Sequence, residues 1–145
     1  MPLWFKIVIG FAVIALIAVT WGILFTERLV EIVDDQLASL RHEDITTAYY
    51  GYTSKGFQET YSLEQFREFL NAHPGLLKNE FSHFGKRGLV KHVGILTGTV
   101  TCANHAVIPM EYQLIKEDGA WKISSMRSLD NKDNDLSYPH ITDRK

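Results

Sequence analysis

The sequence has only one cysteine, Cys102, and no excess of positive charge. A single cysteine cannot form an intrachain disulfide, and it cannot supply the thiolate cluster of a structural zinc site. The 145 residues include 15 basic and 17 acidic side chains, for a formal net charge of −2. A nucleic-acid-binding protein would show a basic stripe, so this balance argues against a nucleic-acid partner.

Motifs for catalysis and for metal binding are also missing. The sequence contains no glycine-rich phosphate loop, no nucleophile elbow and no ordered Ser-His-Asp set. Its six histidines do not have the spacing of a zinc site. We therefore expect no metal, no cofactor and no catalytic residue.

Charge is absent from residues 7–26, which are almost entirely apolar. About 20 such residues in a helix span the roughly 30 Å hydrocarbon core of a bilayer. Trp4 and Trp21 lie near the two ends, where indole rings favour the membrane interface. The run is longer than a signal peptide's apolar region, and it has no polar stripe as a core helix would. Residues 1–26 are therefore predicted to form an N-terminal segment with an uncleaved transmembrane helix, whose partner is the lipid bilayer.

The charges that flank this run predict its orientation. Lys6 precedes the run, whereas residues 27–35 are net acidic. Because positively charged flanks remain in the cytoplasm, we expect a single-pass protein of the inner (cytoplasmic) membrane with a cytoplasmic N-terminus. The domain that follows would be periplasmic or otherwise extracytoplasmic.

Residues 27–129 begin with helical patterns. Over residues 27–41 the apolar positions recur at the helical period, so this helix can continue directly from the membrane span. Its predicted buried face consists of Leu29, Val33, Leu37 and Leu40. Asp44 has the position of an N-cap, and Ser62 with Gln65 forms a capping box for a later helix.

The second half of the domain has strand patterns over residues 80–86, 89–102, 106–117 and 120–129. We expect turns at residues 86–88 and at Asp118-Gly119, the latter a strong hairpin signal. Helices followed by an antiparallel meander indicate an α+β fold, with helices packed on a curved sheet. Residues 130–145 are polar and are predicted to form a flexible tail.

The last predicted hairpin reads Glu117-Asp118-Gly119-Ala120-Trp121-Lys122-Ile123. It resembles the nuclear transport factor 2-like superfamily, whose final hairpin often reads Asp-Gly-x-Trp-Lys-Ile. Ala48-Tyr49 and residues 53–57 and 62–66 are similar to short single-span bacterial membrane proteins of unknown function in that superfamily. The resemblance implies a cone-like fold, in which Trp121 packs against the helices. It implies no single function, because this fold hosts enzymes, carriers and scaffolds.

Enzymes of that superfamily place a polar residue inside the cone. The resemblance therefore makes five residues candidates for the lining of a ligand pocket: Tyr49, Tyr50, His83, His92 and Tyr112. None of them matches a catalytic motif of the superfamily. The alternative is that the tyrosines border the core and the histidines are exposed strand residues.

A small basic patch of Lys86, Arg87 and Lys91 could contact anionic lipid head groups or an acidic partner. A solvated turn is the alternative explanation. The leading hypothesis for function is a membrane-anchored, non-enzymatic binding or scaffold module with membrane or periplasmic protein partners, and a dimer is compatible with it. The alternatives are a carrier of a small apolar ligand and an enzyme of the isomerase or dehydratase type.

Overall fold

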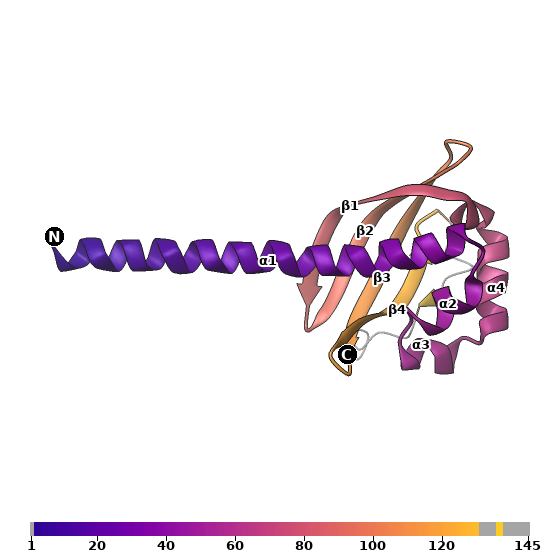
Figure 1. Ribbon diagram of the computed structural model, residues 1–145, viewed down its shortest axis with the longest axis horizontal. Coiled ribbons are helices and arrows are strands. Elements are labelled where there is room, and N and C mark those ends of the chain that lie inside the picture. Colours follow the sequence, from indigo (N-terminus) through magenta and orange to yellow (C-terminus); the bar gives the residue numbers. More distant parts are fainter. Residues whose placement is uncertain (1, 131–135, 138–145) are drawn as a thin grey trace.

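The computed structural model describes residues 2–130 and 136–137 (Figure 1). Its first element, α1 (Leu3–Arg41), is a single helix of 39 residues. Residues 3–21 are exposed on every side, whereas Leu29, Val33, Leu37 and Leu40 are buried. The predicted continuation of the apolar run into the first helix of the domain is therefore confirmed.

Three short helices and a 3-10 turn follow α1. They are α2 (Ile45–Tyr50), α3 (Lys55–Thr60), α4 (Leu63–Ala72) and η1 (Pro74–Lys78). Asp44 caps α2 by accepting a hydrogen bond from the backbone N–H of Thr47. Ser62 and Gln65 form the predicted capping box at the start of α4. Each cap satisfies backbone N–H groups that the first helical turn leaves unpaired.

The second half of the domain is an antiparallel sheet. Its strands are β1 (Asn79–Val90), β2 (Val93–Cys102), β3 (Val107–Glu117), β4 (Ala120–Ser128) and β5 (Leu136–Ser137), paired in that order. The predicted α+β class is confirmed. Within the predicted tail, β5 pairs with β4, while residues 131–135 and 138–145 lie outside the described residues.

The turn expected at residues 86–88 is wrong. β1 continues through Gly88, which pairs with Ile95, and the turn is formed by Lys91 and His92. Both turn residues have positive φ angles, 48° and 68°, as a two-residue type I′ hairpin requires. A glycine signalled the turn in the sequence, yet the chain turns at two side-chain-bearing residues that adopt the left-handed region.

The core lies between the second half of α1 and one face of the sheet (Figure 1). The residues from the sheet that are buried in this core are Phe84, Leu96, Val100, Met110, Tyr112, Leu114, Ile123 and Met126. Gly94 allows the sheet to approach α1 closely, because a Cβ atom there would lie 2.7 Å from Leu29 Cδ1. The helices α2, α3 and α4 lie at the end of the domain remote from the N-terminus (Figure 1).

Candidate functional site

The apolar first half of α1 extends from one end of the domain and is exposed on all sides. By length and composition, α1 is long and apolar enough to cross a membrane, and none of its apolar window is buried. A core helix of a soluble protein has the same composition but is mostly buried. The end of the domain that adjoins this bare segment is called the anchor-side end below.

The meander topology places two hairpin turns at the anchor-side end. In an antiparallel meander the first and third turns lie at one end of the sheet and the second turn lies at the other. The close approach of Gly94 to Leu29 locates the β1–β2 turn beside α1. The contact between Trp121 and Phe25 does the same for the β3–β4 turn. Residues separated by about a hundred positions in the chain thus meet at this end.

A groove of about 430 Å³ opens there between α1 and the β3–β4 hairpin. Its lining residues are Trp21, Phe25, Arg28, Lys116, Gly119 and Trp121. The rings of Phe25 and Trp121 meet edge to face, with centroids 5.1 Å apart. Trp121 is half-buried and does not lie deep in the core. Its contact with a helix is this one, with Phe25 of α1. The groove therefore combines an aromatic wall with two cationic side chains.

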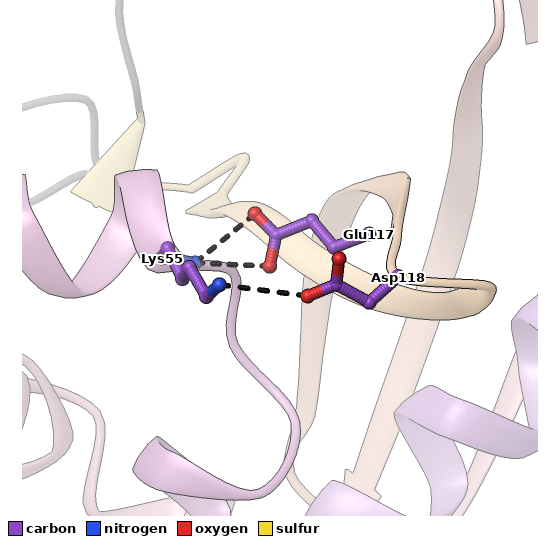
Figure 2. Close-up of polar contacts among 3 residues, drawn as sticks. All are labelled: Lys55, Glu117 and Asp118. Atoms are coloured by element: carbon purple, nitrogen blue, oxygen red, sulfur yellow. Dashed lines mark hydrogen bonds and ion pairs between the residues drawn. The ribbon is translucent and has the colours of Figure 1, made fainter.

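The acidic side chains near the groove have partners within the chain, whereas the two cations that line it do not. In the described part of the chain, the side chains of Arg28 and Lys116 form no hydrogen bond or ion pair. The neighbouring acids of the hairpin contact Lys55 instead (Figure 2). Glu117 accepts from the Lys55 backbone N–H at 3.2 Å, and Asp118 Oδ2 lies 3.5 Å from Lys55 Nζ. The groove keeps two cations whose charge is not neutralised by these acids.

The predicted basic patch is divided by the structure. Lys86 and Arg87 are consecutive residues of β1, so they project to opposite faces of the sheet. Arg87 Nε donates to the carbonyl of Phe84 at 2.8 Å. Lys91 instead lies in the β1–β2 turn at the anchor-side end, next to the exposed side chains of Leu89 and Val90. Only Lys91 of the three therefore lies at the tip of this hairpin.

The five predicted pocket residues do not gather in one place. Tyr49 is buried in the helical layer, where its hydroxyl lies within hydrogen-bonding distance of the carbonyls of Gln58 and Tyr61. Burial, and then the charge of the adjacent Tyr50, raises the pKa of Tyr49.

The other four residues each lie in a different place. Tyr50 is exposed and packs against Tyr49 edge to face. His83 is exposed on β1, and His92 is exposed in the β1–β2 turn. Tyr112 is fully buried in the core beneath α1, where it packs against Phe84.

Beneath α1 the core contains two polar groups that the apolar pattern conceals. Gln36 is fully buried, and its Nε2 donates to the Ala48 carbonyl at 3.2 Å and lies 3.6 Å from Met126 Sδ. Within the described residues, Gln36 Oε1 and the Tyr112 hydroxyl have no hydrogen-bond partner. Burial, and to a lesser degree Asp34, raises the pKa of Tyr112, so this phenol stays neutral at physiological pH.

Sequence reasoning missed Gln36, although a signal was present. Gln36 follows Val33 by three positions and precedes Leu40 by four, so it lies on the predicted apolar face. A lone polar residue on such a face is the observation that could have revealed it. No such signal predicts that Trp21 and Lys116 line the same groove. They lie on α1 and on a hairpin near the C-terminus, and no local sequence pattern relates these two elements.

Two further grooves offer less chemistry. One of about 410 Å³ lies at the opposite end of the sheet, beside Gly75 and Cys102. Burial, and then the charge of Glu80, raises the pKa of the Cys102 thiol, which keeps it protonated and a poor nucleophile.

The other groove, of about 300 Å³, lies between α1 and β1. Three of its polar side chains already have partners within the chain: Ser82 donates to Asp34, and Arg41 donates to Asn79 Oδ1 and, at the same distance of 2.8 Å, to the Asn79 carbonyl. Asp34 accepts the Ser82 bond, and the Glu80 carboxylate is the remaining charged group of the lining. Over residues 2–130 and 136–137, no three His, Cys, Asp or Glu side chains gather so that they could hold a metal ion.

Comparison with known proteins identifies a family but no function. Neither the curated proteins nor the solved structures contain a match to this chain. One family model matches residues 25–136, which begin at Phe25 of the groove and extend through β1–β4 to the first residue of β5. Because that match covers well over half of the sequence, the chain belongs to the family described as a domain of unknown function (DUF4864).

Proposed function

We propose that this protein is a membrane-tethered, non-enzymatic binding or scaffold module whose domain lies outside the cytoplasm. The observation that carries the proposal is the continuity of α1. One helix runs without interruption from an apolar segment that is exposed on all sides into the buried core of the domain. Such a helix would link the domain to the bilayer directly, with no flexible linker between them.

A tether of this kind has two consequences. It confines the domain to the membrane surface, which raises its effective concentration for membrane-bound partners. It also sets the orientation of the domain, because the anchor-side end adjoins the span. The opposite end, where α2 and α4 lie (Figure 1), would then face away from the bilayer and be available to periplasmic or membrane proteins.

The proposed topology is a cytoplasmic N-terminus with one span in the inner membrane. It is supported by Lys6 before the apolar run and by the net acidic stretch after it. A reporter enzyme that is active only in the periplasm, fused after Leu129, should be active. A matched reporter that is active only in the cytoplasm should be silent, and the reverse pair of results would contradict the topology.

We also propose a relationship to the nuclear transport factor 2-like superfamily. Support comes from the order of elements, with helices preceding a four-stranded antiparallel meander, and from Trp121 after the Asp118-Gly119 turn. That superfamily contains binding modules as well as enzymes, so the relationship is compatible with the proposed role. An experimental structure that superimposed on no member of the superfamily would contradict it.

The test of function is complementation of a deletion strain. The intact chain should restore the wild-type phenotype, and so should a chain whose residues 7–20 are replaced by an unrelated apolar helix of equal length. A form lacking residues 1–26 should fail at normal abundance, because it has lost the tether. Full complementation by the untethered form would contradict the proposal.

The alternative with a specific observation in its favour is a ligand-binding role for the core beneath α1. The unpartnered Tyr112 hydroxyl and Gln36 Oε1 are the polar groups that such a ligand could engage.

Under our proposal of a non-enzymatic module, His83→Ala, His92→Ala and Tyr112→Phe all complement the deletion strain. General acid–base groups contribute roughly 10²–10⁴-fold to rate, so a null phenotype from any of these variants at normal abundance would favour an enzyme.

A further inference from the structure

We propose that the groove at the anchor-side end binds the head group of an anionic phospholipid from the bilayer that α1 spans. This inference rests on the proposed function, since it requires the apolar half of α1 to lie in a membrane. It adds a chemically defined ligand and a site that the sequence patterns did not reveal.

The depth of the groove fits a lipid phosphate. Trp21 lies in the last part of the apolar run and is 72% exposed, as an interfacial indole would be. Arg28 lies seven positions further along α1, which at 1.5 Å per residue is roughly 10 Å. The polar layer on each side of a bilayer is about 5–8 Å thick. With Trp21 at the edge of the hydrocarbon, the Arg28 backbone lies about 2–5 Å beyond this layer. Side chains on a helix point back toward its N-terminus, so the long Arg28 side chain reaches the level of the head groups.

The charges of the groove select an anion. Arg28 and Lys116 reach it from different elements, α1 and β3, so the cationic pair exists only in the folded domain. Guanidinium and ammonium groups are the usual protein ligands of phosphate oxygens, and arginine can bind two of them at once. Glu27 and Glu31 are also exposed on α1, but neither lines the groove.

The contacts of Lys55 favour this selectivity. Glu117 and Asp118 directly follow Lys116 in the hairpin and are the acids nearest to it in the sequence. Both carboxylates instead contact Lys55, on the side of α3 (Figure 2). Lys116 is thereby available to an external anion.

The aromatic wall and the second hairpin favour a lipid over another anion. Trp21, Phe25 and Trp121 provide apolar surface for the glycerol and upper acyl region, continuous with the bare span. The β1–β2 tip adds exposed Leu89 and Val90 beside Lys91 at the same end of the sheet. Apolar residues next to cations are typical of a protein surface that rests on anionic head groups.

The test uses the full chain, reconstituted in phosphatidylcholine vesicles. A Trp4→Phe background leaves Trp21 and Trp121, both of which line the groove, as the only indoles. Lipids with brominated acyl chains quench tryptophans that they touch. Titration with brominated phosphatidylglycerol, and in parallel with brominated phosphatidylcholine, yields the relative association constant of the two head groups at the groove.

We expect phosphatidylglycerol to be preferred, and the preference to weaken as ionic strength rises. In the double variant Arg28→Gln/Lys116→Gln the relative association constant should fall at least about fivefold, because each cation near an anionic surface contributes roughly that factor. The matched control is Arg67→Gln/Lys78→Gln, which removes the same charge from exposed positions on α4 and η1. The control should retain the preference.

Equal quenching by both lipids at low salt would overturn the lipid site, as would an equal loss of preference in the control variant. Emission that depends on the protein-to-lipid ratio and not on lipid charge would also overturn it, because the groove would then be an interface between copies of this chain. Failure of the proposed function is seen separately, as release of the unmodified chain from vesicles by alkaline carbonate.

Discussion

The two halves of α1 have the same backbone conformation and opposite surroundings. Residues 3–21 are exposed on all sides, whereas the second half buries Leu29, Val33, Leu37 and Leu40 against the sheet and the short helices. The first half is apolar all round. The second half has an apolar stripe and charged residues on its other faces. Helical conformation alone therefore does not determine the environment of a helix; the distribution of apolar residues around it does.

The largest expected effect separates the two halves by their contribution to domain stability. Leu37→Ala should lower the free energy of unfolding by about 2–5 kcal/mol, because it leaves a cavity in a fully packed core. Leu16→Ala is the matched control, since Leu16 is 70% exposed and touches no part of the domain core. Urea unfolding of the full chain in mild detergent measures both. Equal loss of stability would show that the bare half packs against the domain.

A charge introduced into the exposed half of α1 tests membrane insertion instead of domain stability. Leu16→Asp should make membrane insertion less favourable by about 2.5–3.5 kcal/mol, the cost of a carboxylate at the centre of a span. It should leave the unfolding of the domain unchanged. A glycosylation reporter that distinguishes inserted from translocated chains measures the first quantity, and urea unfolding measures the second. Unchanged insertion would argue that residues 7–26 do not lie in the bilayer.

The junction between the halves should respond more weakly. Trp121→Ala should lower the free energy of unfolding by about 1–2 kcal/mol, below the roughly 3–5 kcal/mol for deleting a fully buried large aromatic residue. The reason is that Trp121 is half-buried and packs edge to face on Phe25. Thermal unfolding of the full chain in detergent is a suitable measurement. A loss of about 3–5 kcal/mol would indicate that the Trp121 ring is covered, by lipid or detergent or by a second copy of the chain.

The smallest expected effect compares two buried tyrosines. Tyr49→Phe should cost about 0.5–1.5 kcal/mol, because the Tyr49 hydroxyl contacts the carbonyls of Gln58 and Tyr61. Tyr112→Phe should be neutral or stabilising, because the hydroxyl of Tyr112 has no partner among the described residues. Denaturant midpoints of the two variants measure the difference. Destabilisation by Tyr112→Phe would indicate a bound water or ligand at that hydroxyl.

Several features of the fold could be predicted because short-range interactions determine them. The caps at Asp44 and Ser62 depend on a side chain and a backbone N–H three residues later. The Asp118-Gly119 turn depends on two residues that readily adopt positive φ angles. The buried stripe of α1 follows from helical periodicity. The hairpin at Lys91 and His92 escaped prediction, because neither residue is a strong turn signal.

The candidate site was less predictable than the fold. Tyr49 and Tyr112 were expected to share a pocket, yet one lies in the helical layer and the other beneath α1. Lys91 was expected to form a basic patch with Lys86 and Arg87, yet its neighbours at the tip of the hairpin are the exposed apolar residues Leu89 and Val90. Neighbours of this kind cannot be predicted from the sequence, because residue spacing shows which side chains share a face of one helix or strand. It does not show which helices and strands pack together.

By itself, the sequence determined that this chain has an apolar helix at its start, short capped helices and an antiparallel meander, since each arises from patterns within about ten residues. Only the tertiary structure decided that Phe25 meets Trp121, that Arg28 and Lys116 share a groove, and that Gln36 is buried near Met126. Those contacts join segments about 90 residues apart. They exist because α1 must bury its apolar stripe on the sheet, and that packing brings the two hairpin tips to the point where the exposed half of α1 begins.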